Sequence, residues 1–179
     1  MPEIEIRPAL SADIDLLTRL DHRSESAYVW QMERALEEDQ FNVTFRQVRL
    51  PRTVRIDYPR MPQALQMEWK AKTAVLVALA DKRPVGYLAV LEQQGPAAAW
   101  VTDLVVDTSF RRKGIATALM LAVQDWAGQR RLRRLVLELQ SKNHPAVRLA
   151  LKLGMEFCGY HDHYYHNQDI ALFFARGLR

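Results

Sequence analysis

The stretch Arg111-Arg112-Lys113-Gly114-Ile115-Ala116 decides the fold that we expect for this chain. It follows an apolar run that ends at Val106 and leads into residues 114–128, where apolar side chains recur at steps of three and four residues. This pattern predicts a strand, a basic loop and a helix, in that order. Because the first amides of a helix have no partner within it and carry a partial positive charge, the loop is predicted to bind an anion such as a phosphate.

The side chains of this loop also suit an anion. Gly114 and the small Ala116 let phosphate oxygens approach the backbone. Positive charge comes from Arg111, Arg112 and Lys113. A solvated basic turn ahead of a helix would show the same residue types, so the loop needs its context. It lacks the Gly-Lys-Ser/Thr ending of a P-loop, which argues against a nucleotide enzyme that holds magnesium on phosphates.

The elements on both sides of the loop are predicted from alternation, helical spacing and turn residues. Upstream, an antiparallel meander is expected from three β-rich runs at residues 73–80, 85–92 and 100–106. Downstream, a strand at 135–140 precedes a helix over 143–153, with Asn143 at its N-cap and Gly154 closing its C-terminus. Two apolar strands at 155–160 and 170–175 finish the chain.

The N-terminal third of the sequence has a weaker pattern. Residues 4–6 predict a first strand, and Ser11 is expected to cap a helix with apolar residues at helical spacing. Residues 21–39 predict another helix, and 41–50 alternate as a strand. The basic stretch 46–60, with its prolines, predicts an irregular insertion.

Length and composition indicate one folded domain. The chain has 179 residues, of which 49% are hydrophobic and 26% charged. Its lone cysteine, Cys158, allows no internal disulfide and no Cys-based zinc cluster, and its place on an apolar strand with Met155 and Phe157 predicts a small core residue. Without a long apolar run or a signal-like N-terminus, we expect a cytoplasmic protein with no membrane partner.

The basic residues and the histidines raise two further possibilities, nucleic-acid binding and metal binding. A nucleic-acid binder could use the basic loop together with Arg130, Arg131, Arg133 and Arg134. The net charge is only +4, acids are interspersed and no aromatic residues interleave, so we expect no nucleic-acid partner. His161, His163 and His166 lack accompanying carboxylates at ligand spacing, so no metal is expected.

The context of the loop resembles a known family. The second helix opens with Asn143-x-x-Ala146 and ends at Lys152-Leu153-Gly154-Met155. The order and spacing of residues 73–154 resemble the core of the GNAT superfamily of N-acetyltransferases, whose Arg/Gln-x-x-Gly-x-Gly/Ala loop cradles the pyrophosphate of acetyl-CoA. Within it, Leu137-Glu138-Leu139-Gln140 and the tail from Tyr164-Tyr165 are similar to streptothricin acetyltransferases.

The resemblance implies a fold and a domain organisation. We expect an α+β, GNAT-like fold with a central, mostly antiparallel, splayed mixed sheet flanked by helices. The strand at 100–106 should carry a bulge and separate from the strand at 135–140. The whole chain, 1–179, would form a single N-acetyltransferase domain with its core at 73–160 and a variable acceptor-side insertion at about 21–72.

The resemblance also implies acetyl-CoA as co-substrate. Its pantetheine would pair with the backbone of Leu104, Val105 and Val106, much as an added strand would. Its diphosphate would bind the loop and the helix start, at Arg111, Arg112, Lys113, Gly114, Ile115, Ala116 and Thr117. Asn143, besides capping its helix, would contact the cofactor.

An acceptor amine must lose a proton before it attacks, so a base is needed near the splay. Alternation places Asp103 on one face with Val101 and Val105, and Glu138 on one face with Val136 and Gln140. Glu138 is the first choice, because related enzymes have a catalytic glutamate there, and Asp103 is the second. Both could equally be surface carboxylates of a half-wet sheet.

A departure from the family concerns the acid that protonates the thiolate. Many members carry a tyrosine where this chain has Ala150. Either no acid is needed, or Tyr160, Tyr164 or Tyr165 supplies it, with Tyr164 as the named candidate. These tyrosines could instead line the amine pocket or pack a C-terminal hairpin.

The function expected from these features is transfer of an acetyl group from acetyl-CoA to a primary amine of a small molecule, by direct attack. The alternatives are acetylation of a protein or peptide amine and a non-catalytic CoA-binding protein. A homodimer is compatible with the sequence.

Overall fold

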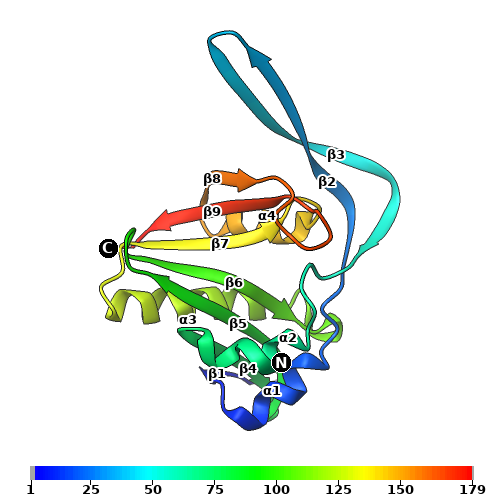
Figure 1. The fold of residues 1–179 in the computed structure, drawn as a ribbon. Coiled ribbons are helices and arrows are strands. Elements are labelled where there is room, and N and C mark those ends of the chain that lie inside the picture. Colours follow the sequence, from blue (N-terminus) through cyan, green and yellow to red (C-terminus); the bar gives the residue numbers. More distant parts are fainter. Residues whose placement is uncertain (1–2, 179) are drawn as a thin grey trace.

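Most strands lie in one large mixed sheet, as Figure 1 shows for the computed structural model, which describes residues 3–178. Seven strands follow the order β1-β4-β5-β6-β7-β9-β8. Their bounds are β1 (Ile4–Pro8), β4 (Ala74–Ala80), β5 (Arg83–Gln93), β6 (Ala98–Val106), β7 (Arg134–Gln140), β8 (Glu156–His161) and β9 (Ala171–Gly177). The helices are α1 (Ser11–Thr18), α2 (Ala64–Glu68), α3 (Ile115–Gln129) and α4 (His144–Lys152), with short 3-10 turns η1 (Trp69–Ala71) and η2 (Thr108–Phe110). This is the expected α+β fold.

The sheet separates at its one parallel pair. β6 and β7 pair only from Ala98 to Val101 against Arg134 to Leu137, and beyond these residues the two strands diverge. The β5–β6 register shifts so that Ala89 faces Asp103 while Val90 faces Val101, which makes Thr102 a bulge residue. The bulge bends β6 away from its neighbour. Both the bulge and the splay are therefore confirmed.

Helices cover the two faces of the sheet. On one face, Leu119 and Val123 of α3 and Val147 of α4 pack in a buried cluster with sheet residues that include Val101 and Leu137. On the other face, Leu17 of α1 packs with Tyr87, Ala89 and Val105. Among the described residues, no helix is both long and apolar enough to cross a bilayer.

The bulge corrects one expectation about Asp103. Alternation predicted that Asp103 shares a face with both Val101 and Val105. Asp103 pairs with Ala89, which lies in the same cluster as Val105, whereas Val101 belongs to the cluster on the opposite face. The extra residue, Thr102, breaks the two-residue period between Val101 and Asp103.

The predicted cap of α1 is also wrong. Ser11 is the first helical residue, and the N-cap position is held by Leu10. Asp13 Oδ2 accepts a 2.7 Å hydrogen bond from the Leu10 N–H, and Arg7 contacts the same carboxylate at 2.7 and 3.0 Å. The hydrogen bonds from Arg7 hold the pKa of Asp13 below its usual value. The helix start is thus stabilised by a carboxylate in its first turn.

The segment predicted as a helix at 21–39 is a strand. β2 (Ser24–Glu37) and β3 (Gln40–Ile56) form a two-stranded hairpin that projects beyond the large sheet in Figure 1. The alternation of Tyr28, Trp30 and Met32 fits this strand. The predicted irregular insertion at 46–60 is wrong as far as Ile56, because Pro51 lies within a strand that has no neighbour on its outer edge.

Cys158 is exposed and does not belong to the core, contrary to the prediction. The β8–β9 register passes from Phe157 to Gly159, so Cys158 is the extra residue of a bulge. β8 is also the edge strand of the sheet. The expectations for α4 are confirmed, since Asn143 Oδ1 accepts from the Ala146 N–H at 3.2 Å and Gly154 has φ +69° after the helix.

Candidate active site

The loop before α3 leaves a set of backbone amides pointing out of the helix start. Gly114 has φ +82°, a left-handed conformation that glycine adopts without strain. The helical ladder begins with the 2.9 Å bond from the Ala118 N–H to the Gly114 carbonyl. The amides of residues 114–117 precede this bond and have no partner within the helix. They are the amides at which the sequence predicts an anion site.

The three basic residues of the loop differ in what they contact. Arg111 is half-buried and anchors the loop, with Nε donating to the Val106 carbonyl at 2.9 Å and Nη2 to the Asp21 carbonyl at 3.0 Å. Burial lowers its pKa, against the raising effect of Asp21. Lys113 donates to the Ser109 carbonyl at 3.1 Å, and Arg112 is exposed. Arg112 and Lys113 are both exposed, so either side chain can turn toward an anion, Lys113 by giving up its bond to Ser109.

A cleft lies where β6 and β7 separate. Its empty volume is about 400 Å³, which includes space open to solvent. Its walls come from the diverging strands, the start of α4, the segment after β3 and the C-terminal loop. The lining residues are Tyr58, Pro59, Arg60, Thr102, Leu104, Leu137, Glu138, Leu139, Gln140, Asn143, Ala146 and Tyr165. Leu104, Glu138 and Asn143 of the predicted site border it.

Glu138 is buried at the edge of this cleft, with 5% of its surface exposed. Its Oε2 accepts from Trp100 Nε1 and from the Tyr164 hydroxyl, each at 2.9 Å, and its Oε1 accepts from Arg60. Burial and the neighbouring Glu138 raise the pKa of Tyr164 to about 12. The tyrosine therefore keeps its proton at neutral pH and donates a hydrogen bond to the carboxylate.

Asp103 is buried on the same side of the sheet, behind the cleft lining. Its Oδ2 accepts from Thr102 Oγ1 at 2.8 Å and lies 3.6 Å from Lys72 Nζ. Its Oδ1 accepts from the Tyr58 hydroxyl and lies 3.7 Å from Arg60. Neither Asp103 nor Glu138 is a surface carboxylate, so that alternative is wrong.

Arg60 connects the two carboxylates, and the sequence analysis missed it. Burial disfavours its charge, but Asp103 and Glu138 raise its pKa, so the guanidinium stays charged. It also lies over the Tyr165 ring, 5.2 Å from the centroid. Arg60 stands in a stretch of scattered arginines, where no motif distinguishes the one that folds into the site.

Of the remaining residues that the sequence singled out, Tyr165 lies at the cleft, and Tyr160 and Ala150 pack elsewhere in the fold. Tyr165 is buried and borders the cleft, whereas Tyr160 packs against Phe45 with ring centroids 5.3 Å apart. Ala150 is fully buried in α4, so its position supplies no proton donor. Among residues 3–178, no group of histidine, cysteine or acidic side chains could hold a metal ion.

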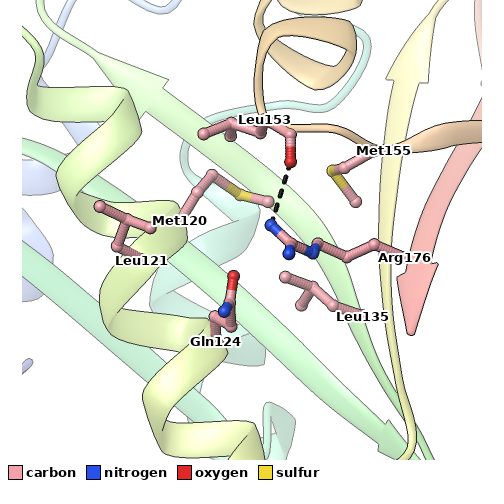
Figure 2. A pocket seen from close by; sticks show the side chains of 7 residues that line it. All are labelled: Met120, Leu121, Gln124, Leu135, Leu153, Met155 and Arg176. Atoms are coloured by element: carbon pink, nitrogen blue, oxygen red, sulfur yellow. Dashed lines mark hydrogen bonds between the residues drawn. The ribbon is translucent and has the colours of Figure 1, made fainter. Parts of the chain in front are cut away.

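A second hollow lies away from these residues. Figure 2 shows seven side chains around about 190 Å³ between α3, β7 and the end of α4, namely Met120, Leu121, Gln124, Leu135, Leu153, Met155 and Arg176. Arg176 donates to the Leu153 carbonyl at 3.0 Å across it. No residue of the predicted site lines this hollow, whereas Leu104, Glu138 and Asn143 border the cleft between β6 and β7.

A parallel strand pair that opens beside unpaired helix amides, with a buried carboxylate in the opening, defines an acyl-CoA-dependent N-acetyltransferase. The chain belongs to the acetyltransferase (GNAT) family, whose model matches residues 29–155. Enzymes of this family use acetyl-CoA. No curated protein matches the sequence significantly.

Solved structures share the fold over almost the whole chain. A nourseothricin acetyltransferase superposes with a TM-score of 0.82 at 21% identity, over 98% of this chain and 99% of that one. A candidate streptothricin acetyltransferase from Bacillus anthracis, in complex with acetyl coenzyme A, gives 0.76 at 17% identity, over 98% and 99%. The ribosomal-protein-S18-alanine N-acetyltransferase from Escherichia coli gives 0.69 at 13%, over 98% and 94%. At these identities the likeness shows the fold.

Proposed function

We propose that this enzyme moves an acetyl group from acetyl-CoA to a primary amine of a small molecule by direct attack. The observation that carries the proposal is the cleft between the separated ends of β6 and β7, because the buried carboxylate of Glu138 borders it and β6 leads into the loop with the unpaired helix amides. The loop that carries the amides of residues 114–117 follows the end of β6, where Arg111 donates to the Val106 carbonyl, and Glu138 borders the cleft. A long thioester carrier and an amine can thus meet between the strands.

The chain offers matching groups for each part of acetyl-CoA. The amides of Gly114, Ile115, Ala116 and Thr117 would bind the diphosphate, with charge from Arg112 and Lys113. Backbone groups of Leu104 and Val105 would pair with pantetheine, as would Asn143 at the start of α4. The Val106 carbonyl already accepts from Arg111, so that residue contributes less than the sequence suggested.

Glu138 is proposed as the base that receives the proton of the acceptor amine. It borders the cleft, whereas Asp103 lies behind it. Its three donors, Trp100, Tyr164 and Arg60, fix its orientation. Asp103 stays the second candidate for the base, and it also helps to hold Arg60 in place.

Tyr164 is proposed to position Glu138 rather than to act as an acid. With a pKa of about 12, its hydroxyl remains protonated through the working range. A thiol has a pKa of about 8.5, so a thiolate leaves readily and would take little benefit from so weak an acid. The absence of a tyrosine at Ala150 is consistent with a reaction that needs no dedicated acid.

The acceptor side is proposed to lie in the segment that the sequence analysis called an insertion. Residues 21–72 bring Tyr58, Arg60 and Lys72 to the two carboxylates. Structural neighbours named for nourseothricin, streptothricin and aminoglycoside amines support a small-molecule acceptor. We retain the view that the chain is one domain with its core at 73–160, working in the cytoplasm without nucleic acid or metal.

The test is release of free thiol from acetyl-CoA across a panel of amines. The panel would contain streptothricin, aminoglycosides, polyamines, amino acids and peptides with free N-termini. We expect turnover with small amines and a product heavier by one acetyl group in the mass spectrum. Activity confined to peptides or proteins would favour the alternative acceptor. Calorimetry that shows no binding of acetyl-CoA or free CoA would overturn the proposal as a whole.

A further inference from the structure

Gln140 is the last residue of β7 and lies two positions after Glu138. Leu137 and Leu139 pack in the buried cluster that contains residues of α3 and α4. Since side chains alternate along a strand, Glu138 and Gln140 share the other face of β7. Both border the cleft, and Gln140 is only 4% exposed. A buried amide thus lies on the same face as the proposed base, about 7 Å farther along the strand.

The nitrogen of this amide is held by two acceptors. Gln140 Nε2 donates to Asp169 Oδ2 at 2.9 Å and to the Asp57 carbonyl oxygen at 3.3 Å. Asp169 also pairs with Lys142, as an ionised carboxylate does. A carboxylate and a carbonyl group accept hydrogen bonds and donate none, so they fix which end of the amide is the nitrogen. The oxygen Oε1 therefore occupies the opposite end of the amide.

The amide oxygen is open to a ligand. The two bonds of Nε2 are the only side-chain hydrogen bonds that Gln140 makes within residues 3–178. In the same part of the chain, no side-chain nitrogen or oxygen is both fully enclosed and without a partner. Oε1 is therefore accessible, and the cleft that Gln140 borders gives the access. A ligand that displaces water from this acceptor must supply a donor in its place.

Tyr165 is a second polar side chain at the cleft, and it differs from Gln140 in what it can distinguish. Tyr165 is 5% exposed and borders the same cleft. A hydroxyl group donates as well as accepts, so it can pair with an ether oxygen of a ligand as well as with an alcohol. An amide oxygen only accepts. Gln140 is hence the group that distinguishes a ligand with an N–H or O–H donor from one without it.

We propose that Gln140 Oε1 selects the acceptor, by accepting a hydrogen bond from a second N–H or O–H group of the amine while its reacting nitrogen lies at Glu138. This inference rests on the proposed function and narrows its substrate class. The spacing of the two side chains along β7, about 7 Å, suits an amine whose second donor lies across a chain of four carbons, which spans about 6 Å when extended. Gln140 binds the substrate and takes no part in proton transfer.

Two amines that differ only in this donor test the inference. The first is 4-aminobutanol, and the second is its methyl ether, 4-methoxybutylamine, which has the same charge and chain but no hydroxyl proton. With the wild-type enzyme we expect kcat/KM for the alcohol to exceed that for the ether by about 10-fold or more, because the ether leaves a desolvated acceptor unpaired. Release of thiol from acetyl-CoA measures both constants. A wild type without this preference would refute the inference.

Variants of Gln140 assign the preference to its oxygen. Gln140→Met, of similar length, should abolish the preference and leave the KM for acetyl-CoA unchanged. Gln140→Lys keeps a donor for Asp169 but has no acceptor, so it should abolish the preference too. Calorimetry with acetyl-CoA checks that each variant is folded. If either folded variant keeps the preference of the wild type, Gln140 does not select the acceptor.

Asp169→Asn is the matched control for a merely structural role. It breaks the ion pair with Lys142 but keeps an oxygen for Gln140 Nε2, so it disturbs the C-terminal loop while Oε1 stays in place. We expect kcat/KM to fall by the same factor for both amines, with the preference retained. Gln140→Met and Asp169→Asn that both lower the two amines equally would give Gln140 a structural role only and overturn the inference.

Failure of this inference can be distinguished from failure of the proposed function. If acetyl-CoA does not bind and no amine of the panel is acetylated, the proposed function fails and the role of Gln140 fails with it. If acetyl-CoA binds and amines of the panel are acetylated, but the alcohol is not preferred to the ether, only the role of Gln140 is wrong. A rise in the KM for acetyl-CoA in Gln140→Met, equal with both amines, would instead assign the oxygen to the cofactor.

Discussion

Arg60 Nη1 donates a 2.8 Å hydrogen bond to the carbonyl oxygen of Thr102. Thr102 is the bulge residue at which β6 turns away from β7. The other terminal nitrogen of Arg60 pairs with the carboxylate of Glu138 on β7. A single side chain from outside the sheet thus occupies the gap between the strands and satisfies a backbone acceptor that has lost its strand partner.

Replacing Arg60 with alanine is expected to destabilise the fold and abolish activity. Two buried carboxylates would lose a shared cation, and breaking a buried ion pair costs about 3 kcal/mol or more. Denaturant unfolding and thiol release would measure the two effects. Arg60→Lys should recover part of the stability but not the activity, because a lysine cannot contact both strands at once. The exposed Arg52→Ala is the matched control.

Glu138→Gln is expected to lower kcat by about 100-fold or more, because the amide cannot accept a proton from the amine. The KM for acetyl-CoA should change little, since the proposed diphosphate site is built from other residues. Steady-state kinetics of thiol release would separate the two constants. Glu156→Gln, an exposed glutamate of β8, is the control. If Glu138→Gln and Asp103→Asn both retained full activity, the assignment of the base would be wrong.

Arg111→Ala and Arg112→Ala should give different results despite their adjacency. Arg111 anchors the loop through two backbone carbonyls, so its loss should lower the free energy of unfolding by about 1 to 3 kcal/mol. Arg112 is exposed, so its loss should leave stability unchanged and weaken CoA binding, most clearly at low salt. Thermal denaturation beside calorimetry at two salt concentrations tests this. Equal effects on stability would contradict the assigned roles.

His22 is expected to make the protein less stable on mild acidification. Its Nδ1 donates to the Leu20 carbonyl at 2.7 Å, and its Nε2 lies 3.1 Å from the Tyr87 hydroxyl. Burial lowers the pKa of His22 below the unfolded value of about 6.5. Between the two pKa values the unfolded chain binds more protons, so stability is full above about pH 6.5 and falls as the pH drops.

The size of this effect is bounded. One such group changes the free energy of unfolding by at most about 1.4 kcal/mol per pH unit. Urea unfolding at a series of pH values between about 7.5 and 5 would measure the slope, and His22→Gln should flatten it. The exposed His166→Gln is the control. An unchanged slope in His22→Gln would assign the pH dependence to other groups.

Sequence periodicity predicted the core because its elements obey simple rules. The strands from Thr73 onward, α3 and α4 follow apolar periods, and Asn143 and Gly154 mark the ends of α4 by their chemistry. Two errors have one cause, since bulges at Thr102 and Cys158 each add a residue and shift the rest of the strand by one position. Periodicity cannot locate a bulge, because the same residues fit an unbroken strand.

The sequence predicted only part of the site, because some of its contacts join residues that lie far apart in the chain. Glu138 and the amides around Gly114 belong to local elements whose geometry is set by nearby sequence. Arg60 reaches Glu138 across 78 positions of the chain, and Tyr58 reaches Asp103 across 45. Contacts of that separation depend on how the β2–β3 hairpin returns to the body, and residues 21–39 were predicted as a helix.

Only four residue pairs join β6 to β7, so the large sheet consists of two parts that are connected by a short stretch of strand pairing. One part contains β1, β4, β5 and β6, and the other contains β7, β9 and β8. A molecule that binds in the opening would replace the missing backbone pairing and connect the two parts of the sheet. Binding of that molecule would then slow amide hydrogen exchange along both strands at once, so the rigidity of the enzyme would depend on whether its ligand is bound.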